Sequence, residues 1–170
     1  MSEIFACIVV WLHVAEPGAV ARSNLLIGLP TKVTNMELPG EVVELIDLPS
    51  TCKVITTHDA NGQVHSIYMG SLMAPSRSEL IFGRVRSRRT HQNLMEMRKR
   101  GGTATVLVTE GMRSFEIRFL PKEYTESGPA LDKVNGQLAE VGLKACGAWI
   151  LEPTEVWNQG AVPEAGTRVV

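Results

Sequence analysis

The stretch "CKVITTHDANGQVHSIYMGSLM" (residues 52–73) predicts a β-hairpin. Its first part is rich in β-branched residues, which favour an extended backbone. Residues 59–62 (DANG) have the composition of a tight turn. The residues after the turn, through Met73, are expected to form the returning strand. Pro75 and Ser76 are expected to break the chain before a third strand at residues 79–85.

A second hairpin is predicted further along the chain, from "TATVLVT" (residues 103–109) and "RSFEIRFL" (residues 113–120). In the latter, Phe115, Ile117 and Phe119 alternate with polar residues, which is typical of a half-buried antiparallel strand. The final strand is expected in "ACGAWILEPTEVW". Short antiparallel strands favour a closed or nearly closed barrel, because closure removes exposed edges. The sequence therefore predicts an α+β fold with a β-barrel core of about six strands.

Three short helices are expected to flank the barrel. They are predicted between Pro39 and Pro49, at about residues 90–98, and from Ser127 to Gly142. In the third, Ser127 is the expected N-cap and Pro129 occupies the first turn. An apolar stripe from Leu131 to Val141 is expected to pack against the sheet.

The bulk composition is that of one soluble globular domain: 170 residues, 44% hydrophobic and 21% charged. Three widely spaced cysteines argue against a disulfide framework or a zinc site, and favour reduced thiols in a cytoplasmic protein. Residues 4–12 are apolar, but this run is too short to span a bilayer. We interpret residues 1–35 as an N-terminal appendage, residues 36–160 as the working domain and residues 161–170 as a tail.

Positive charge gathers in "GRVRSRRTHQNLMEMRKR" (residues 83–100), which has seven Lys and Arg residues and one acid, so its charge is 7 − 1 = +6. The whole chain has a net charge of −1. A nucleic acid, a phosphorylated cofactor or an ordinary solvated helix could each explain the cluster. Aromatic residues make up only 5% of the chain, which offers little for base stacking. Arg98, Lys99 and Arg100 fit the last turn of a helix, where cations complement the dipole.

In their order along residues 36–157, these segments resemble the FMN-binding split barrel of the pyridoxamine 5′-phosphate oxidase-like proteins. The hairpin "ITTHDANGQVHSIYMGSLM" is similar to the strands that open that barrel, and "ELIFGRVRSRRTHQNLMEMRK" to its next strand, basic turn and helix. "TATVLV", "SFEIRFLPKEYTESGPALDKV" and "AWILEPTEVW" resemble the elements that follow. The resemblance implies an antiparallel split β-barrel with short flanking helices.

The resemblance also implies a site for FMN in a cytoplasmic homodimer, with the flavin at the subunit interface and oxidoreductase chemistry. Matched to the family motif, the positions expected at the FMN phosphate are Ser87, Arg88, Arg89, Thr90 and Asn93. Those expected beside the isoalloxazine ring are Tyr68, Met69, Gly70 and Ser71. A helix N-terminus with hydroxyl and guanidinium groups suits a phosphate dianion. No metal site and no catalytic acid or base is predicted.

Two alternatives stay open from the sequence. One is a split barrel without FMN that binds haem or a deazaflavin, although His65 and His91 lack a distinctive haem-ligand setting. The other is a nucleic-acid-binding protein that uses the basic segment at residues 84–100. The family commonly has Asn-Pro where this chain has "RKRGG" (residues 98–102), and its C-terminal Arg motif has no assured match here. Oxidation of pyridoxamine phosphate is therefore not predicted.

Overall fold

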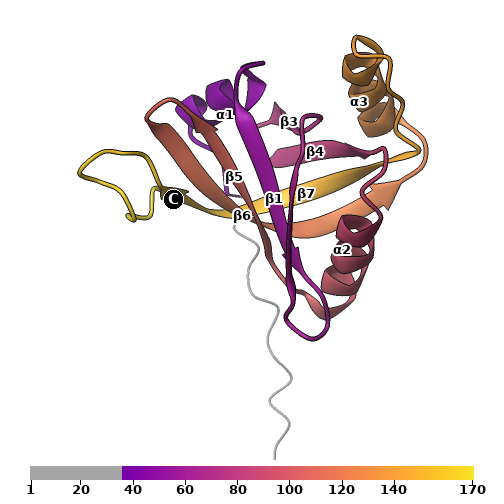
Figure 1. Ribbon diagram of the computed structural model, residues 1–170, viewed down its shortest axis with the longest axis horizontal. Coiled ribbons are helices and arrows are strands. Elements are labelled where there is room, and N and C mark those ends of the chain that lie inside the picture. The colour runs from indigo at the N-terminus through magenta and orange to yellow at the C-terminus, as the bar shows by residue number, and fades with distance from the viewer. Residues whose placement is uncertain (1–35) are drawn as a thin grey trace, which may run out of the picture. The chain divides into compact units, whose positions relative to one another are not determined.

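The computed structural model describes residues 36–170, which form one antiparallel sheet of seven strands with three helices (Figure 1). The strand order is β2-β1-β5-β6-β7-β4-β3. The elements are α1 (Gly40–Asp47), β1 (Cys52–His58), β2 (Val64–Tyr68), β3 (Met73–Ser76), β4 (Glu79–Arg84), α2 (Arg88–Arg100), β5 (Ala104–Glu110), β6 (Arg113–Thr125), α3 (Pro129–Ala139) and β7 (Gly147–Asn158). The predicted N-terminal appendage lies outside the described residues.

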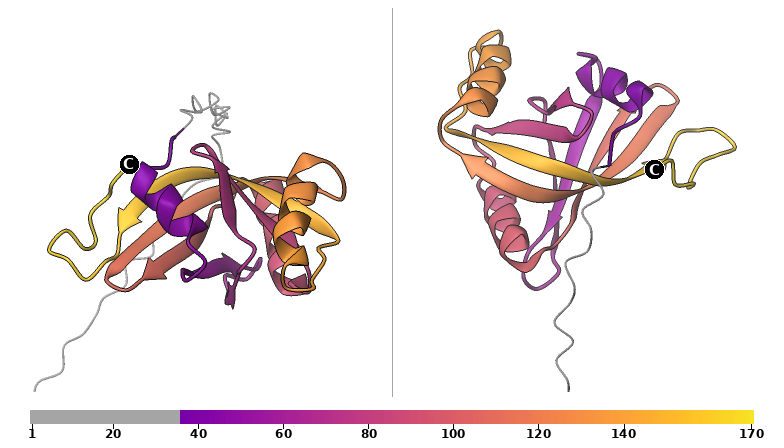
Figure 2. Two further views of the ribbon diagram at one scale, coloured as in Figure 1. Left: turned by 90° about the horizontal axis from the view of Figure 1, so that it is seen from above. Right: turned by 180° about the vertical axis from the view of Figure 1, so that it is seen from behind.

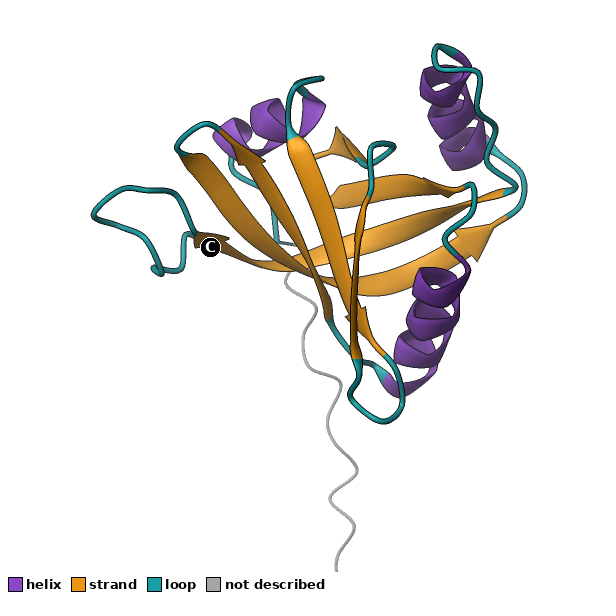
Figure 3. Ribbon diagram, in the orientation of Figure 1, coloured by secondary structure: helices purple, strands orange, loops and turns teal. Residues whose placement is uncertain are grey.

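The sheet is strongly coiled, so that β1 and β2 run at a steep angle to β4 and β7 (Figure 3). The long strand β6 joins the two halves, because it pairs with β5 along its first part and with β7 along most of its length. The β6–β7 pairing shifts register at Arg118/Phe119 and again at Pro121/Glu123. Such bulges bend a strand and increase its twist. The predicted α+β split barrel is confirmed, with seven strands.

The first hairpin differs from the prediction after Tyr68. The returning strand ends there, and the Leu72 amide donates to the Met69 carbonyl at 3.2 Å, which closes a tight turn. The chain then forms β3, a strand that contains both Pro75 and Ser76, so the prediction that these two residues break the chain was wrong. Proline cannot donate to a β-ladder, but β3 is one of the two edge strands of the sheet, where a missing donor is tolerated.

The helices follow the predicted apolar spacing, with corrections at their ends. In α1, Val42, Leu45 and Ile46 are buried, as that spacing predicts. The N-cap of α3 is Gly128, without a side-chain cap, so the prediction of Ser127 as N-cap was wrong. Val141 lies beyond the end of α3 and is 69% exposed, so it does not belong to the buried stripe.

Two apolar clusters hold these elements together. The larger one fills the barrel and includes Trp149 and Phe119. The smaller one lies under α3 and includes Val134 and Leu138. Gly83 on β4 allows α3 to approach closely, because a Cβ at Gly83 would collide with Val134 and lie 2.9 Å from the Ala145 Cβ. Figures 1 and 2 show that α2 and α3 both lie at the end of β4 where the chain leaves the sheet.

Candidate functional site

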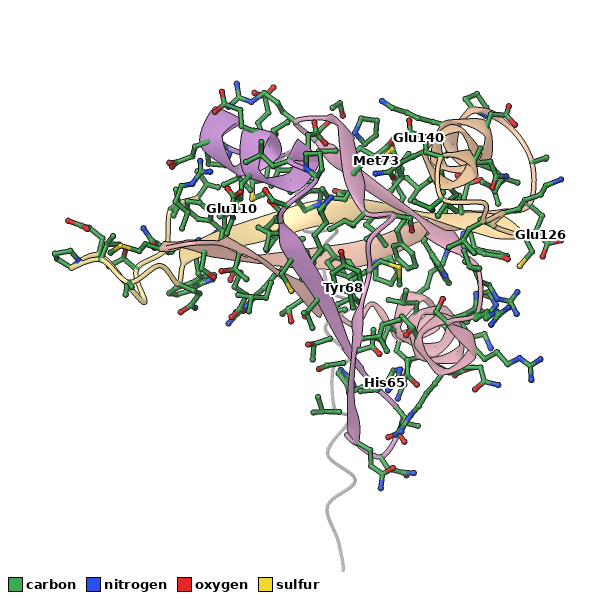
Figure 4. All side chains as sticks on the ribbon, turned by 45° about the horizontal axis from the view of Figure 1, so that its top comes forward. His65, Tyr68, Met73, Glu110, Glu126 and Glu140 are labelled. Atoms are coloured by element: carbon green, nitrogen blue, oxygen red, sulfur yellow. The ribbon has the colours of Figure 1, made fainter. Side chains whose placement is uncertain are left out.

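A cavity of about 720 Å³ lies among the ends of several elements. The corner between α1 and β1, the turn after β2, the end of β4 and the C-terminal end of α3 all contribute to its lining. Figure 4 shows two lining residues from different elements, Tyr68 on β2 and Glu140 at the end of α3. A cavity of this size is in the usual range for small-molecule and cofactor sites.

The four residues predicted to lie beside a ring system, Tyr68, Met69, Gly70 and Ser71, all line this cavity. Tyr68 is 63% exposed, whereas Met69 and Ser71 are buried. The Ser71 hydroxyl accepts a hydrogen bond from the Gly83 amide at 3.1 Å, which ties the turn to β4. The Tyr68 ring folds over Gly70, where an added Cβ would lie 3.2 Å from Cε1 of the ring. This part of the cavity wall therefore combines apolar side chains with the exposed backbone of Gly70.

The start of α2 carries hydrogen-bond donors that nothing satisfies among residues 36–170. Ser87 precedes the helix and lines the cavity, but its hydroxyl makes no capping bond and is buried without a partner. The Thr90 hydroxyl is likewise buried and unpaired. The backbone N–H groups of Arg89 and Thr90 have no hydrogen-bond acceptor among the described residues. Unsatisfied N–H groups with a hydroxyl at a helix N-terminus form a ready site for an anion.

Four arginines surround this helix start without a carboxylate partner in the described part of the chain: Arg84, Arg86, Arg88 and Arg89. Elsewhere among residues 36–170, Arg77, Arg113, Arg118 and Arg168 each pair with a glutamate. Arg86, which was not among the predicted site residues, lines the cavity. Arg98 and Arg100, in the last turn of α2, also lack a carboxylate partner there. The four arginines at the uncapped helix start reinforce its preference for an anion.

The remaining predicted residues do not line the cavity. Arg88 and Arg89 are exposed, and Arg89 reaches Gln63 on the hairpin turn at 3.5 Å. Thr90 is fully buried. Asn93 is also buried, and its amide donates to the Thr57 hydroxyl at 2.9 Å. The structure thus brings Tyr68, Met69, Gly70, Ser71 and Ser87 to one cavity, whereas the other four lie in α2 and do not line it.

An aromatic cluster supports the first turn of α2. The ring of His91 lies 4.5 Å from that of Tyr124 and 5.6 Å from that of Trp149, measured between centroids. The Tyr124 hydroxyl accepts a hydrogen bond from Arg84 at 3.2 Å. Burial raises the pKa of Tyr124, and the Arg84 guanidinium offsets part of that rise. Arg84 is therefore held in place by a neutral phenol and keeps its charge near the start of α2.

Burial lowers the pKa of His91 below its ordinary value of 6.5, the Arg84 charge lowers it further, and Glu126 opposes the change. A histidine with a lowered pKa binds fewer protons in the folded state than in the unfolded state. The free energy of unfolding therefore falls as pH drops through 6.5 towards the folded pKa, and this contribution is absent above 6.5.

We expect His91→Phe to reduce the loss of stability on acidification, because Phe keeps the ring contacts and cannot be protonated. Urea unfolding followed by far-UV circular dichroism between about pH 7.5 and 5.5 would measure the difference. His65→Phe, on the edge strand β2, is the matched control. An acid-induced loss in His91→Phe equal to that of the wild type would contradict this explanation.

Several cavity residues were not predicted from the sequence, including Lys53, Gln137, Val141 and Leu143. Lys53 carried a usable signal, because it occupies an inward position of β1 in register with Ile55 and Thr57. A charged residue on the inward face of a strand is unusual unless it has a partner or a function. The residues at the end of α3 gave no such signal, since only the folded chain brings them to the cavity.

No protein-family model and no curated protein matches the sequence. Among solved structures, HupZ of Group A Streptococcus aligns with a TM-score of 0.62 at 15% identity, covering 76% of this chain and 99% of that one. An FMN-binding protein from Syntrophomonas wolfei aligns with a TM-score of 0.60 at 15% identity, covering 72% and 88%. A candidate pyridoxamine 5′-phosphate oxidase from Lactobacillus delbrueckii aligns with a TM-score of 0.57 at 21% identity, covering 74% and 97%.

This chain therefore has the split-barrel fold of the pyridoxamine 5′-phosphate oxidase-like proteins. The same fold occurs in an F420 reductase, with a TM-score of 0.52, and in HutZ, the haem storage protein of Vibrio cholerae, with a TM-score of 0.50. The fold thus serves more than one cofactor, and the residues of the site, not the fold, determine which ligand is bound. Within residues 36–170, no helix is long and apolar enough to cross a membrane.

Proposed function

We propose that this protein is a flavoprotein that binds FMN in the cavity and uses it for hydride or electron transfer. The observation that carries the proposal is the set of unsatisfied donors at the start of α2, directly beside a cavity of about 720 Å³. FMN requires this combination, because it joins a phosphate dianion to a large, mostly apolar ring.

The phosphate end of FMN fits the chemistry at the start of α2. The amides of Arg89 and Thr90 and the hydroxyl of Ser87 would donate to the phosphate oxygens. The guanidinium groups of Arg88 and Arg89 are exposed and make no ion pair with residues 36–170, so they are free to add charge-assisted bonds. Buried donors without acceptors cost stability in the free protein, and a bound phosphate would remove that cost.

The ring end fits the wall formed by Tyr68, Met69 and Gly70, with Val85 and Leu138 as further apolar lining. The bound flavin supplies the redox chemistry, and the protein orients it and shapes its surroundings. Met69 and Leu138 are largely buried, so they would keep water from the face of the ring that they cover.

We further propose that the active form is a homodimer. Three side chains that line the cavity are exposed and largely apolar: Tyr68 at 63%, Val141 at 69% and Leu143 at 46%. A flavin ring bound against them would remain partly in water in a single chain. A second copy packed on this rim would cover both the apolar side chains and the ring.

The first experiment is a visible absorption spectrum of the purified protein, repeated after addition of FMN and removal of the excess by gel filtration. A retained flavin spectrum at about one FMN per chain, in a dimer-sized peak, is the expected result. A protein that retains no FMN would overturn the proposal. Parallel incubations with haemin, coenzyme F420 and a single-stranded oligonucleotide would then identify which other ligand the site takes.

A further inference from the structure

Lys53 is a buried cation whose bonding is incomplete. Its side chain lies on the inward face of β1, the residue is only 4% exposed, and the ammonium donates to the Leu72 carbonyl at 3.0 Å. An ammonium has three N–H donors. The Lys53 ammonium makes no other hydrogen bond and no ion pair with residues 36–170. Burying a charged group with a single acceptor lowers the stability of the fold. Ionisable groups in such an environment are common at functional sites.

The position of Lys53 links it to a ligand. It lines the main cavity and also a smaller one of about 290 Å³, and the two cavities share Asp47, Lys53 and Gln137. The main cavity also reaches Ser87 at the start of α2. One molecule that fills it would therefore have one end near the anion site and another near Lys53. Burial lowers the pKa of Lys53, and the Asp47 carboxylate partly counteracts this shift. Asp47, which also lines both cavities, therefore helps to keep the Lys53 ammonium charged.

Gln137 supplies the complementary group. Its side-chain oxygen is buried and has no hydrogen-bond partner among the described residues. The last full turn of α3 carries it, and it lines both cavities. A buried amide oxygen needs a donor, just as the spare N–H groups of Lys53 need acceptors. Together the two side chains present donors and an acceptor to whatever occupies the cavity.

We propose that Lys53 and Gln137 form a recognition site for an imide edge, in which a carbonyl oxygen of the ligand accepts from Lys53 and the adjacent N–H donates to Gln137. This inference rests on the proposed FMN function. In FMN the matching group is the pyrimidine edge of the ring, with the C2 carbonyl beside the N3–H. The phosphate at α2 and the imide at Lys53 then fix the two ends of the cofactor, and the apolar wall at Met69 contacts the ring between them.

The test compares ligands that differ at one end only. We would measure the dissociation constants of FMN, riboflavin and N3-methylriboflavin for the wild type, Lys53→Met and Gln137→Leu. Lys53→Met is expected to weaken FMN and riboflavin by the same factor, about 10- to 100-fold, because both carry the imide edge. The wild type should prefer riboflavin to N3-methylriboflavin by about tenfold, and Gln137→Leu should abolish that preference. Lys122→Met, an exposed lysine on β6 that lines neither cavity, should bind all three like the wild type.

The outcomes separate this inference from the proposed function. If the wild type retains no flavin, both fail. If FMN binds but Lys53→Met leaves riboflavin affinity unchanged, or weakens FMN alone, the imide site is wrong and the flavoprotein proposal stands. Replacing a buried ammonium with an apolar chain of similar length is not expected to prevent folding. Should Lys53→Met fail to fold, the N3-methyl preference of the wild type and Gln137→Leu decides the question alone: a preference equal in both proteins overturns the inference.

Discussion

Trp149→Ala is expected to lower the free energy of unfolding by about 3–5 kcal/mol, the cost typical of removing a large buried aromatic side chain. Trp149 is 1% exposed and is paired across the sheet with Phe82 on β4 and with Tyr124 on β6. Its ring also lies 5.6 Å from that of His91 on α2. One side chain therefore joins three strands to the helix that begins at the proposed anion site, and its loss should loosen that junction.

Urea unfolding followed by far-UV circular dichroism would measure the change without using tryptophan fluorescence. Trp157→Ala is the matched control, because Trp157 lies on the same strand but is only half-buried. Its indole donates to Glu155 at 3.0 Å and its ring lies under Arg118, contacts worth about 1 kcal/mol each near a surface. A loss in Trp149→Ala no larger than that in Trp157→Ala would show that the junction does not depend on this side chain.

Most of the helices and strands can be predicted from the sequence, because the residues that the local patterns mark as apolar are also those that pack in the barrel. The alternation of Phe115, Ile117 and Phe119 survives in β6 because all three side chains are buried. The apolar spacing in α1 survives for the same reason. The pattern failed at Pro75, where the local rule of a strand breaker was overridden by the position of β3 at the sheet edge.

Only part of the candidate site could be predicted from the sequence. Ser87 and the residues around Gly70 were found because they belong to a local motif of the resembled family. Lys53 and Gln137 lie far apart in the chain, and only the packing of α3 against β4, which the absence of a side chain at Gly83 permits, brings α3 to the cavity. A sequence pattern records which residues are buried, but it does not record which buried polar atoms remain without partners.

Arg88→Ala/Arg89→Ala is expected to weaken FMN binding by about 10²- to 10⁴-fold. Each charge-assisted bond to a phosphate contributes about 1.5–3 kcal/mol, and every 1.4 kcal/mol is tenfold in affinity. Both side chains are exposed and unpaired with any acid among residues 36–170, so their removal leaves no buried charge and little change in stability is expected.

The matched control is Arg98→Ala/Arg100→Ala, which removes the same charge from the other end of α2. Those cations complement the helix C-terminus, and screening limits their effect on a phosphate at the N-terminus. Riboflavin, which lacks the phosphate, should bind the wild type and both double variants alike. Equal FMN affinity in the two double variants would remove Arg88 and Arg89 from the site.

If salt-dependent binding of an oligonucleotide were lost in both double variants while FMN affinity stayed unchanged, the basic segment would be a nucleic-acid surface, since a phosphate backbone would contact arginines along the whole helix.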